Sequence, residues 1–308
     1  MDGRNRASLE MIARPSVSSP RIINDKLRDS RIWNYVNPRP TDIIIASCYK
    51  VGTTVAQQIV NLLVHGHDEF DSLHKLSPWV EESHEEFLEP QALQNLINHL
   101  ENLPDPRFFK SHLSFDGLPY YPEWKYIYLA RDGRDVGLSL FNMCLACVPD
   151  ENDPSYKKRC NIYGKPINFG EFWDRWIETG EPLWCYWEHL ESWWQVRHLP
   201  NVLLVHFSNL VNDKPNEICR IAKFLNVPMD EETLDYVMRY SSLEYMKQNW
   251  EKFEPPGVMR RNLFFNKGSN GRWKDLLTPA QIEYYENFIF QRLGHECANW
   301  VKNGTFLA

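Results

Sequence analysis

The chain has 308 residues, 43% of them hydrophobic, which is enough for the core of one large domain or two small ones. The formal net charge of −7 argues against broad electrostatic binding to nucleic acid or to an anionic membrane surface. No stretch approaches the roughly 20 apolar residues of a membrane helix, and residues 1–19 lack the apolar core of a secretory signal. The seven cysteines show no framework spacing, so the sequence predicts a cytoplasmic protein without nucleic-acid or membrane partners.

The first structured elements are expected after an irregular, proline-punctuated lead-in over residues 1–41. The β-branched run from Ile43 to Ile45 predicts a buried strand. The residues that follow the next loop predict a helix, because apolar side chains recur there at spacings of three and four, at Val55, Ile59, Leu62 and Leu63.

Further along the chain, apolar runs predict strands at residues 107–112, 125–130 and 201–206. Amphipathic spacing predicts helices at residues 90–103, 216–225, 231–240 and 279–293, and Asp132 is positioned to cap another. Loops are expected at residues 148–170 and 250–273. Strands that alternate with helices indicate an α/β fold, a parallel β-sheet with helices on both faces, and we expect residues 42–308 to form a single domain.

The loop from Cys48 to Thr54 lies between the first strand and the first helix. The free N–H groups and the dipole of a helix N-terminus favour an anion there. Lys50 adds a positive charge, Gly52 lets the backbone bend toward a ligand, and Thr53 and Thr54 add hydroxyl donors. The loop therefore predicts a phosphate site, although its lysine precedes the glycine, unlike that of a nucleoside-triphosphate loop ending in Gly-Lys-Ser/Thr.

Basic residues follow three predicted strands: Lys50 the first, Lys110 and His112 the second, and Arg131 the third. Because the carboxyl ends of parallel strands meet at one edge of a sheet, we expect these side chains to converge on one ligand.

Two features of the composition predict ordinary surface and core roles. The glutamates between Trp79 and Phe87 predict a solvated acidic face, with a mouth for a cationic substrate as the alternative. The six tryptophans of residues 172–196 predict core or a pocket wall.

With these residues in view, the chain resembles the cytosolic sulfotransferase family, which uses 3′-phosphoadenosine 5′-phosphosulfate (PAPS). The resemblance runs from about Asp42 to Leu293. The family's first signature loop matches the segment from Cys48 to Thr54 in its lysine, glycine and both threonines. Three further motifs match in order, at Lys110-Ser111-His112, at Arg131 with Ser139 eight residues later, and from Asn266 to Lys274.

The resemblance implies a P-loop-like sulfotransferase fold and transfer of a sulfuryl group from PAPS to a hydroxyl or amine, with release of the bisphosphate PAP. It implies that His112 is the general base, that Lys50 stabilises the leaving phosphate oxygen and that Lys110 steadies the sulfuryl oxygens. It also implies a set of nucleotide-binding residues and no metal. Among them, those for the phosphates are Val51, Gly52, Thr53 and Thr54 on the 5′ side, and Arg131, Ser139, Lys267 and Gly268 on the 3′ side.

Most departures from the family pattern fall on the adenine side, and one, at Asn266, removes a phosphate charge contact. Val55 stands where a tryptophan usually stacks on adenine, and Phe207 stands where a tyrosine offers a hydroxyl. Ser241 and Leu243 replace a threonine and a phenylalanine. An arginine of the last motif is Asn266, for which Arg272, Arg261 or Arg260 are candidate substitutes. We expect the same donor to bind, with fewer stacking and hydrogen-bonding contacts to its adenine.

The acceptor is expected to be a small molecule, with Trp79 as a candidate pocket wall because Pro78 to Glu81 resemble an acceptor-pocket segment of the family. A dimer motif is nearly present as Lys274, Thr278, Pro279 and Glu283, where proline replaces a valine, so a homodimer stays open. Two alternative functions also stay open: a nucleotide-loop phosphotransferase and a non-catalytic nucleotide-binding protein.

Overall fold

The computed structural model describes residues 20–82, 90–147, 162, 164, 168–253 and 268–306. Its centre is a four-stranded sheet in the order β2-β1-β3-β4, and every neighbouring pair is parallel. The strands are β1 (Ile43–Ser47), β2 (Phe108–Ser111), β3 (Lys125–Ala130) and β4 (Val202–His206). Ala46 pairs with Ser111 on one side and with Tyr128 on the other, so the strands end near one another at one edge. The predicted α/β fold is confirmed.

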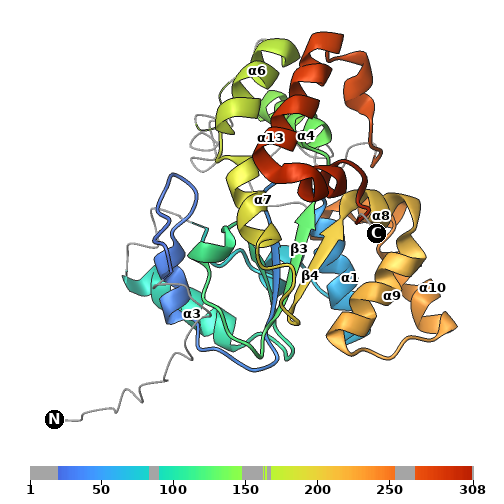
Figure 1. Ribbon diagram of the computed structural model, residues 1–308. Coiled ribbons are helices and arrows are strands. Elements are labelled where there is room, and N and C mark those ends of the chain that lie inside the picture. The colour runs from blue at the N-terminus through green and yellow to red at the C-terminus, as the bar shows by residue number, and fades with distance from the viewer. Residues whose placement is uncertain are drawn as a thin grey trace.

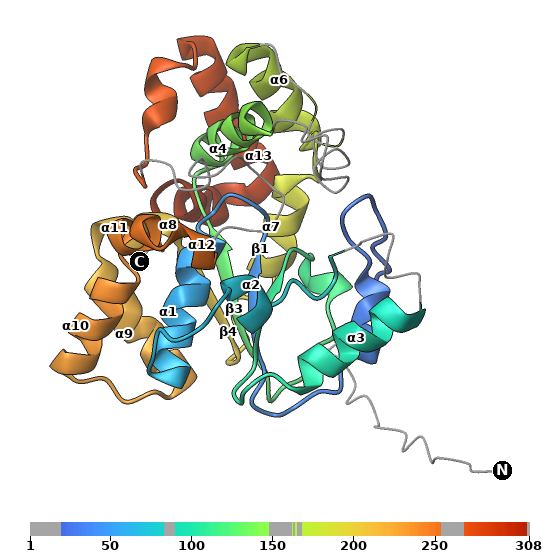
Figure 2. The same cartoon turned by 180° about the vertical axis from the view of Figure 1, so that it is seen from behind.

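Helices surround this sheet (Figures 1 and 2). On one side lie α1 (Thr53–His65), α9 (Lys214–Leu225) and α10 (Glu231–Tyr240), and α3 (Pro90–Glu101) lies on the other. Beyond the carboxyl ends of the strands gather α4 (Gly133–Ala146), α6 (Phe169–Thr179) and α13 (Pro279–Asn303), and α7 (Tyr186–Trp194) packs against α13. None of the helices in the described residues is both long and apolar enough to cross a membrane.

Several short elements went unpredicted because three to six residues show too little periodicity. They are η1 (Ser30–Tyr35), α2 (Leu73–Leu76), η3 (Phe115–Gly117), α8 (Phe207–Asn212), α11 (Leu243–Gln248), α12 (Trp250–Phe253) and η4 (Arg272–Asp275). The prediction of a loop over residues 250–273 is therefore wrong at both ends, where α12 and η4 lie, and residues 254–267 fall outside the described residues. The last helix continues past residue 293 because the chain resumes helical geometry after a kink at Gly294, whose φ is 73°.

The N-terminal residues that the structure describes pack against the sheet. The Trp33 ring lies 5.9 Å from that of Phe109 and 6.1 Å from that of Trp124, and it is buried. The expected domain boundary at residue 42 stays a prediction.

The tryptophan-rich segment contributes mainly to the core. Trp173, Trp176, Trp187 and Trp193 are fully buried, and Trp193 stacks on Tyr128 of β3 at 5.1 Å. Trp193 thus joins α7 to the sheet, while Trp176 of α6 packs on Trp187 of α7 at 5.9 Å, and the prediction that these rings form core is confirmed.

A buried ion pair joins the amino ends of β1 and β2. The Arg107 guanidinium donates to both carboxylate oxygens of Asp42, at 2.8 and 2.7 Å, and neither side chain is exposed. This end of the sheet lies opposite the edge that carries the phosphate loop.

We expect Asp42→Ala to lower the free energy of unfolding by about 3–5 kcal/mol, because it leaves the Arg107 charge buried without its partner. Urea denaturation measures this. The control is Arg175→Gln, which breaks an ion pair with Glu181 whose side chains are both more than half exposed; that change should cost less than about 1 kcal/mol. Equal losses would show that the Asp42–Arg107 pair is not a structural anchor.

Candidate active site

The phosphate loop bends at two residues with positive φ, Lys50 at 57° and Gly52 at 97°. Gly52 precedes α1 and offers no side-chain cap, so the first N–H groups of the helix lack that partner. The Thr53 hydroxyl lies 2.7 Å from the Ser47 hydroxyl at the end of β1. The loop has the geometry of a helix-N-terminal anion site.

Three cationic side chains meet beside this loop. Burial first, and then the charges of Arg131 and Lys110, lower the pKa of Lys50 to about 8. Arg131 also reaches the loop directly, since its Nη1 donates to the Lys50 carbonyl at 3.4 Å. The structure therefore brings Lys110 of β2 together with Lys50 and Arg131, which follow β1 and β3.

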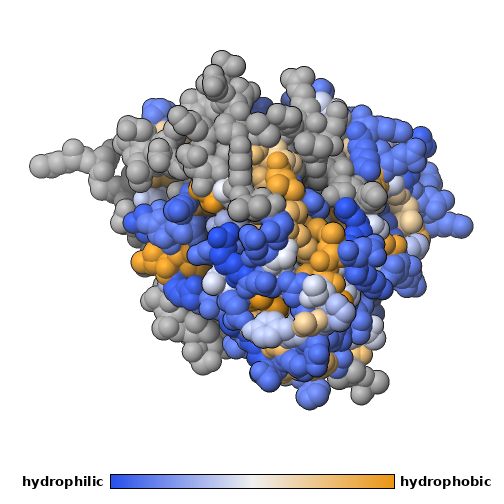
Figure 3. All heavy atoms as spheres, turned by 90° about the horizontal axis from the view of Figure 1, so that it is seen from above, coloured by the Kyte–Doolittle hydropathy of each residue, from blue (hydrophilic) through white to orange (hydrophobic). Residues whose placement is uncertain are grey.

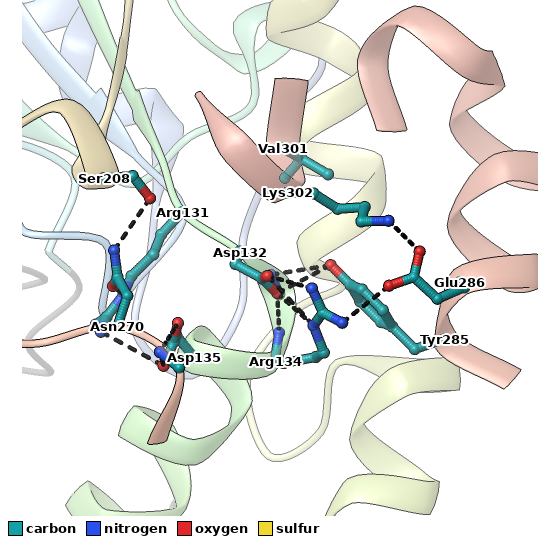
Figure 4. Close-up of polar contacts among 12 residues, drawn as sticks. Arg131, Asp132, Arg134, Asp135, Ser208, Asn270, Tyr285, Glu286, Val301 and Lys302 are labelled. Carbon is teal, nitrogen blue, oxygen red and sulfur yellow. Dashed lines mark hydrogen bonds and ion pairs between the residues drawn. The ribbon is translucent and has the colours of Figure 1, made fainter. Parts of the chain in front are cut away.

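Arg131 is held by the C-terminal loop, as Figure 4 shows. Its Nε donates to the Asn270 amide oxygen at 3.0 Å, and Nη2 donates to the Ser269 carbonyl at 3.1 Å. Asn270 in turn donates to the Ser208 hydroxyl at 3.0 Å. Burial lowers the pKa of Arg131, and the Asp135 carboxylate, 3.8 Å away, opposes that shift.

The start of α4 is fixed beside Arg131. Asp132 accepts from the Arg134 backbone N–H, as predicted for a helix cap, and it also pairs with the Arg134 side chain and accepts from the Tyr285 hydroxyl. This network joins β3, α4 and α13, so it fixes the direction in which Arg131 leaves the sheet.

The other predicted nucleotide contacts vary in their surroundings. Ser139 is half-buried on α4, whereas the Ser241 hydroxyl is buried and donates to the Val237 carbonyl at 2.6 Å. A side chain at Gly268 would meet Leu243, since an added Cβ would lie 2.6 Å from its Cδ2. Val51 is buried, while Thr54 and Val55 are half-buried in the loop and first turn of α1. Asn266, Lys267, Arg260 and Arg261 lie outside the described residues.

Two further residues, Phe207 and Arg272, lie close to Arg131. The Phe207 ring packs on Gly52 and lies under Arg131, whose Cζ is 4.4 Å from the ring centroid. Of the three candidate substitutes for the missing arginine, Arg272 lies close enough to Arg131 to lower its pKa.

His112 follows β2 and faces the phosphate loop. Its Nδ1 lies 2.8 Å from the Ser47 carbonyl oxygen, which can only accept a hydrogen bond. Nδ1 therefore carries the proton, and the lone pair of the neutral ring is on Nε2. Burial first, and then the Lys110 charge, hold the pKa of His112 well below its usual value of 6.5. The imidazole is thus neutral at physiological pH, which is the state that a base requires.

Glu81 corrects the expectation of a solvated acidic face. Its side chain is fully buried and accepts from the His112 backbone N–H at 2.6 Å and the Ser111 hydroxyl at 3.0 Å. It also accepts from the indoles of Trp79 and Trp33, at 2.6 and 3.0 Å. Burial raises the pKa of Glu81, and these hydrogen bonds counteract the shift. Its match to the family's acceptor-pocket segment was the one signal in the sequence.

Trp79 lies against His112, with ring centroids 4.8 Å apart in an edge-to-face arrangement. The Lys110 ammonium lies 4.9 Å from the Trp79 ring. On another side, the Trp184 ring lies 5.9 Å from His112 and also lines a cavity of about 510 Å³. The surface toward which the strands point shows hydrophobic residues gathered between hydrophilic ones (Figure 3).

A family model described as the sulfotransferase domain matches residues 40–296, most of the chain. The chain belongs to this family. Among its relatives, sulfotransferase 1 family member D1 of Mus musculus is 28% identical over 277 residues, covering 85% of this chain and 87% of that protein. Human sulfotransferase 1E1 is 28% identical over 278 residues, covering 85% and 88%.

Solved structures agree with this sulfotransferase assignment. Retinol dehydratase in complex with androsterone and the inactive cofactor PAP superimposes with a TM-score of 0.65 at 25% identity, over 85% of this chain and 83% of that one. Mouse sulfotransferase SULT7A1, complexed with PAP, gives a TM-score of 0.70 at 18% identity over 90% and 93% of the chains, a likeness of fold.

We expect Gly52→Ala to weaken PAP binding about ten- to a hundredfold. An added Cβ would lie 2.4 Å from Phe207 Cδ2, and strain at such a φ costs about 1–3 kcal/mol, so the loop must move. Calorimetric titration with PAP measures the effect. Gly66→Ala is the matched control, since its φ of 73° is also positive but nothing lies within 4 Å of the new Cβ at the far end of α1. Equal losses of affinity in both variants would contradict a role for the loop.

The Lys50 environment predicts a pH dependence. Below its pKa of about 8 the ammonium is charged before binding, whereas above it the anion must draw a proton onto Lys50. PAP affinity should therefore fall as pH rises through 8, with proton uptake on binding. Calorimetry in two buffers of different ionisation heat measures the uptake. Lys50→Met should abolish it, while Lys214→Met, at a lysine whose pKa burial also lowers to about 8, should retain it.

Proposed function

We propose that this sulfotransferase moves a sulfuryl group from PAPS to a hydroxyl, or an amine, of a small molecule, with His112 as general base. The observation that carries the proposal is the Nδ1–H bond to the Ser47 carbonyl, which leaves the Nε2 lone pair for an acceptor proton beside the phosphate loop. The PAP bound to structural relatives supports the choice of donor.

In the proposed reaction, His112 Nε2 takes the acceptor proton while the acceptor oxygen or nitrogen forms a bond to sulfur. The bond between sulfur and the bridging phosphate oxygen breaks, and PAP is released. Lys50 stabilises the charge on that oxygen, and Lys110 stabilises the sulfuryl oxygens. As in phosphoryl transfer, positioning and electrostatic stabilisation supply most of the rate enhancement.

The nucleotide would lie with its 5′-phosphate on the amides and hydroxyls of residues 51–54. Arg131 would hold the 3′-phosphate with Ser139, Gly268 and Lys267, and Arg272 would supply charge there. No group of three or more potential metal-ligating side chains occurs in the described part of the chain, and a reaction without metal stays a prediction.

A small alcohol or phenol with apolar surface is the proposed acceptor. Trp79 is the proposed wall, because its ring touches His112. Retinol dehydratase has been solved with androsterone and with retinol, which supports an acceptor of this size and polarity.

The location and assembly stay predictions. We propose a cytoplasmic enzyme, although Cys147 is disulfide-bonded, which counts against a reducing compartment. Thr278 and Pro279 of the near-match to the dimer motif cap and begin α13, and a homodimer stays open.

Transfer of labelled sulfate from PAPS to a library of phenols, alcohols and amines tests the proposal. We expect His112→Ala to lower the transfer rate about 10²–10⁴-fold and to leave PAP affinity unchanged. His198→Ala is the control, since His198 is exposed. Undiminished turnover in His112→Ala would contradict the role of His112 as general base.

Binding and transfer assays on the unsubstituted protein distinguish the two alternative functions from the sulfotransferase. Binding of ATP with magnesium in place of PAP would indicate the phosphotransferase. Tight PAP binding without transfer to any acceptor would indicate the non-catalytic protein.

A further inference from the structure

The segment Asp25–Asp29, here called the N-terminal strap, lies beside the peptide that carries His112. Asp29 N–H donates to the Glu81 carbonyl at 2.8 Å, and Arg28 forms an isolated antiparallel bridge with Glu82. The strap is therefore fastened to the same chain segment that supplies the Glu81 carboxylate.

Arg28 is a buried charged residue of the strap, only 6% exposed. Its Nη1 donates to the His112 carbonyl at 2.8 Å, while Nε and Nη2 donate to Asp25 Oδ2 at 2.9 and 2.7 Å. Asp25 Oδ1 accepts the backbone N–H groups of Leu27 and Arg28, both at 2.9 Å. The guanidinium also stacks on Trp184, with Cζ 3.6 Å from the ring centroid. Arg28 is thus held on two sides while one arm reaches His112.

We propose that Arg28 is a positioning residue for the His112 base, acting from the N-terminal strap through the His112 carbonyl. This inference rests on the proposed function.

The His112 peptide is held at both of its polar atoms. Glu81 accepts from its N–H at 2.6 Å, and Arg28 donates to its carbonyl at 2.8 Å. Both hydrogen bonds involve a charged group, which makes them stronger than neutral ones. The ring is then fixed by Ser47. Since a misplacement of about 1 Å in a reacting group can cost about 10²-fold in rate, removing the Arg28 bond should be visible in turnover.

Arg28 also sets the charge around the imidazole. Burial is the largest cause that disfavours the protonated His112 ring, and Lys110 from β2, His189 from α7 and Arg28 from the strap add to it, whereas the hydrogen bond to the Ser47 carbonyl favours protonation. Glu81 binds the His112 backbone from the segment before α3. Loss of the Arg28 charge should therefore raise the pKa of His112 and move the acid limb of the kcat profile to higher pH.

The experiment compares Arg28→Gln, Arg28→Lys and Arg31→Gln. Arg31 is the matched control because its guanidinium makes a similar fork in the same region, to Asp29, yet its side chain is half exposed. We expect Arg28→Gln to lower kcat about 10²-fold and to shift the acid limb upward, with PAP affinity unchanged. Arg28→Lys should lower kcat but keep the acid limb, because the charge remains. Arg31→Gln should behave as the unsubstituted protein.

A second readout does not depend on turnover. Nitrogen NMR of His112 in the PAP complex reports its tautomer and its pKa, and we expect a single Nδ1-protonated form that Arg28→Gln converts to a mixture with a raised pKa. If Arg28→Gln does not fold, Asp25→Asn, which keeps Arg28 but weakens its anchor, should shift the tautomer balance and lower kcat in the same direction.

An unchanged tautomer, pKa and kcat in folded Arg28 variants would overturn the inference. Absence of sulfuryl transfer in the unsubstituted protein would instead overturn the proposed function, and the NMR comparison would still decide the role of Arg28.

Discussion

The close approach of Lys50, Lys110 and Arg131 is the electrostatic condition on which the site depends. Burial and then the charges of Arg131 and Lys110 disfavour the Lys50 ammonium and lower its pKa to about 8. The sheet enforces this approach, because β2, β1 and β3 are neighbours whose carboxyl ends share one edge. A polyanion removes the mutual repulsion, so the fold creates its affinity for a phosphorylated ligand by holding the cations together.

Two arginines at opposite edges of the sheet differ in their partners: Arg107 anchors the fold, and Arg131 is the proposed phosphate contact. At the amino edge of the sheet, Arg107 is matched by the Asp42 carboxylate with two short hydrogen bonds, so its charge is neutralised. At the carboxyl edge, Arg131 is oriented mainly by neutral acceptors, the Asn270 amide and the Ser269 and Lys50 carbonyls. Its nearest carboxylate, Asp135, lies at 3.8 Å and also accepts from the Gly271 N–H. Neutral acceptors fix a guanidinium without cancelling its charge, which suits a phosphate contact.

The parts of this arrangement that local sequence encodes were predictable. The strand at residues 125–130 and the helix at residues 231–240 have the expected bounds, and Asp132 caps α4. Apolar runs, helical periodicity and caps act over a few residues, so the sequence shows them directly. Glu81 and Arg28 were hidden because a charged residue is buried only when partners from elsewhere in the chain satisfy it. The Arg28 contact to His112 spans 84 residues, and no local pattern marks it.

The residues predicted to surround the adenine offer fewer aromatic contacts than the family pattern, whereas those predicted for the phosphates keep most of their charges. Phe207 lacks a hydroxyl, yet its ring packs on Gly52 and lies 4.4 Å from the Arg131 Cζ, so it supports two residues that we propose contact phosphate. The Ser241 hydroxyl is already bonded to Val237, and Leu243 packs against Gly268 where an aromatic ring would otherwise stack. Base stacking on an aromatic side chain contributes about 1–3 kcal/mol, and aliphatic contacts forgo most of it. In the proposed site, charge would therefore supply a larger share of donor recognition, and we expect donor affinity to depend on salt and pH more than it would with an aromatic adenine clamp.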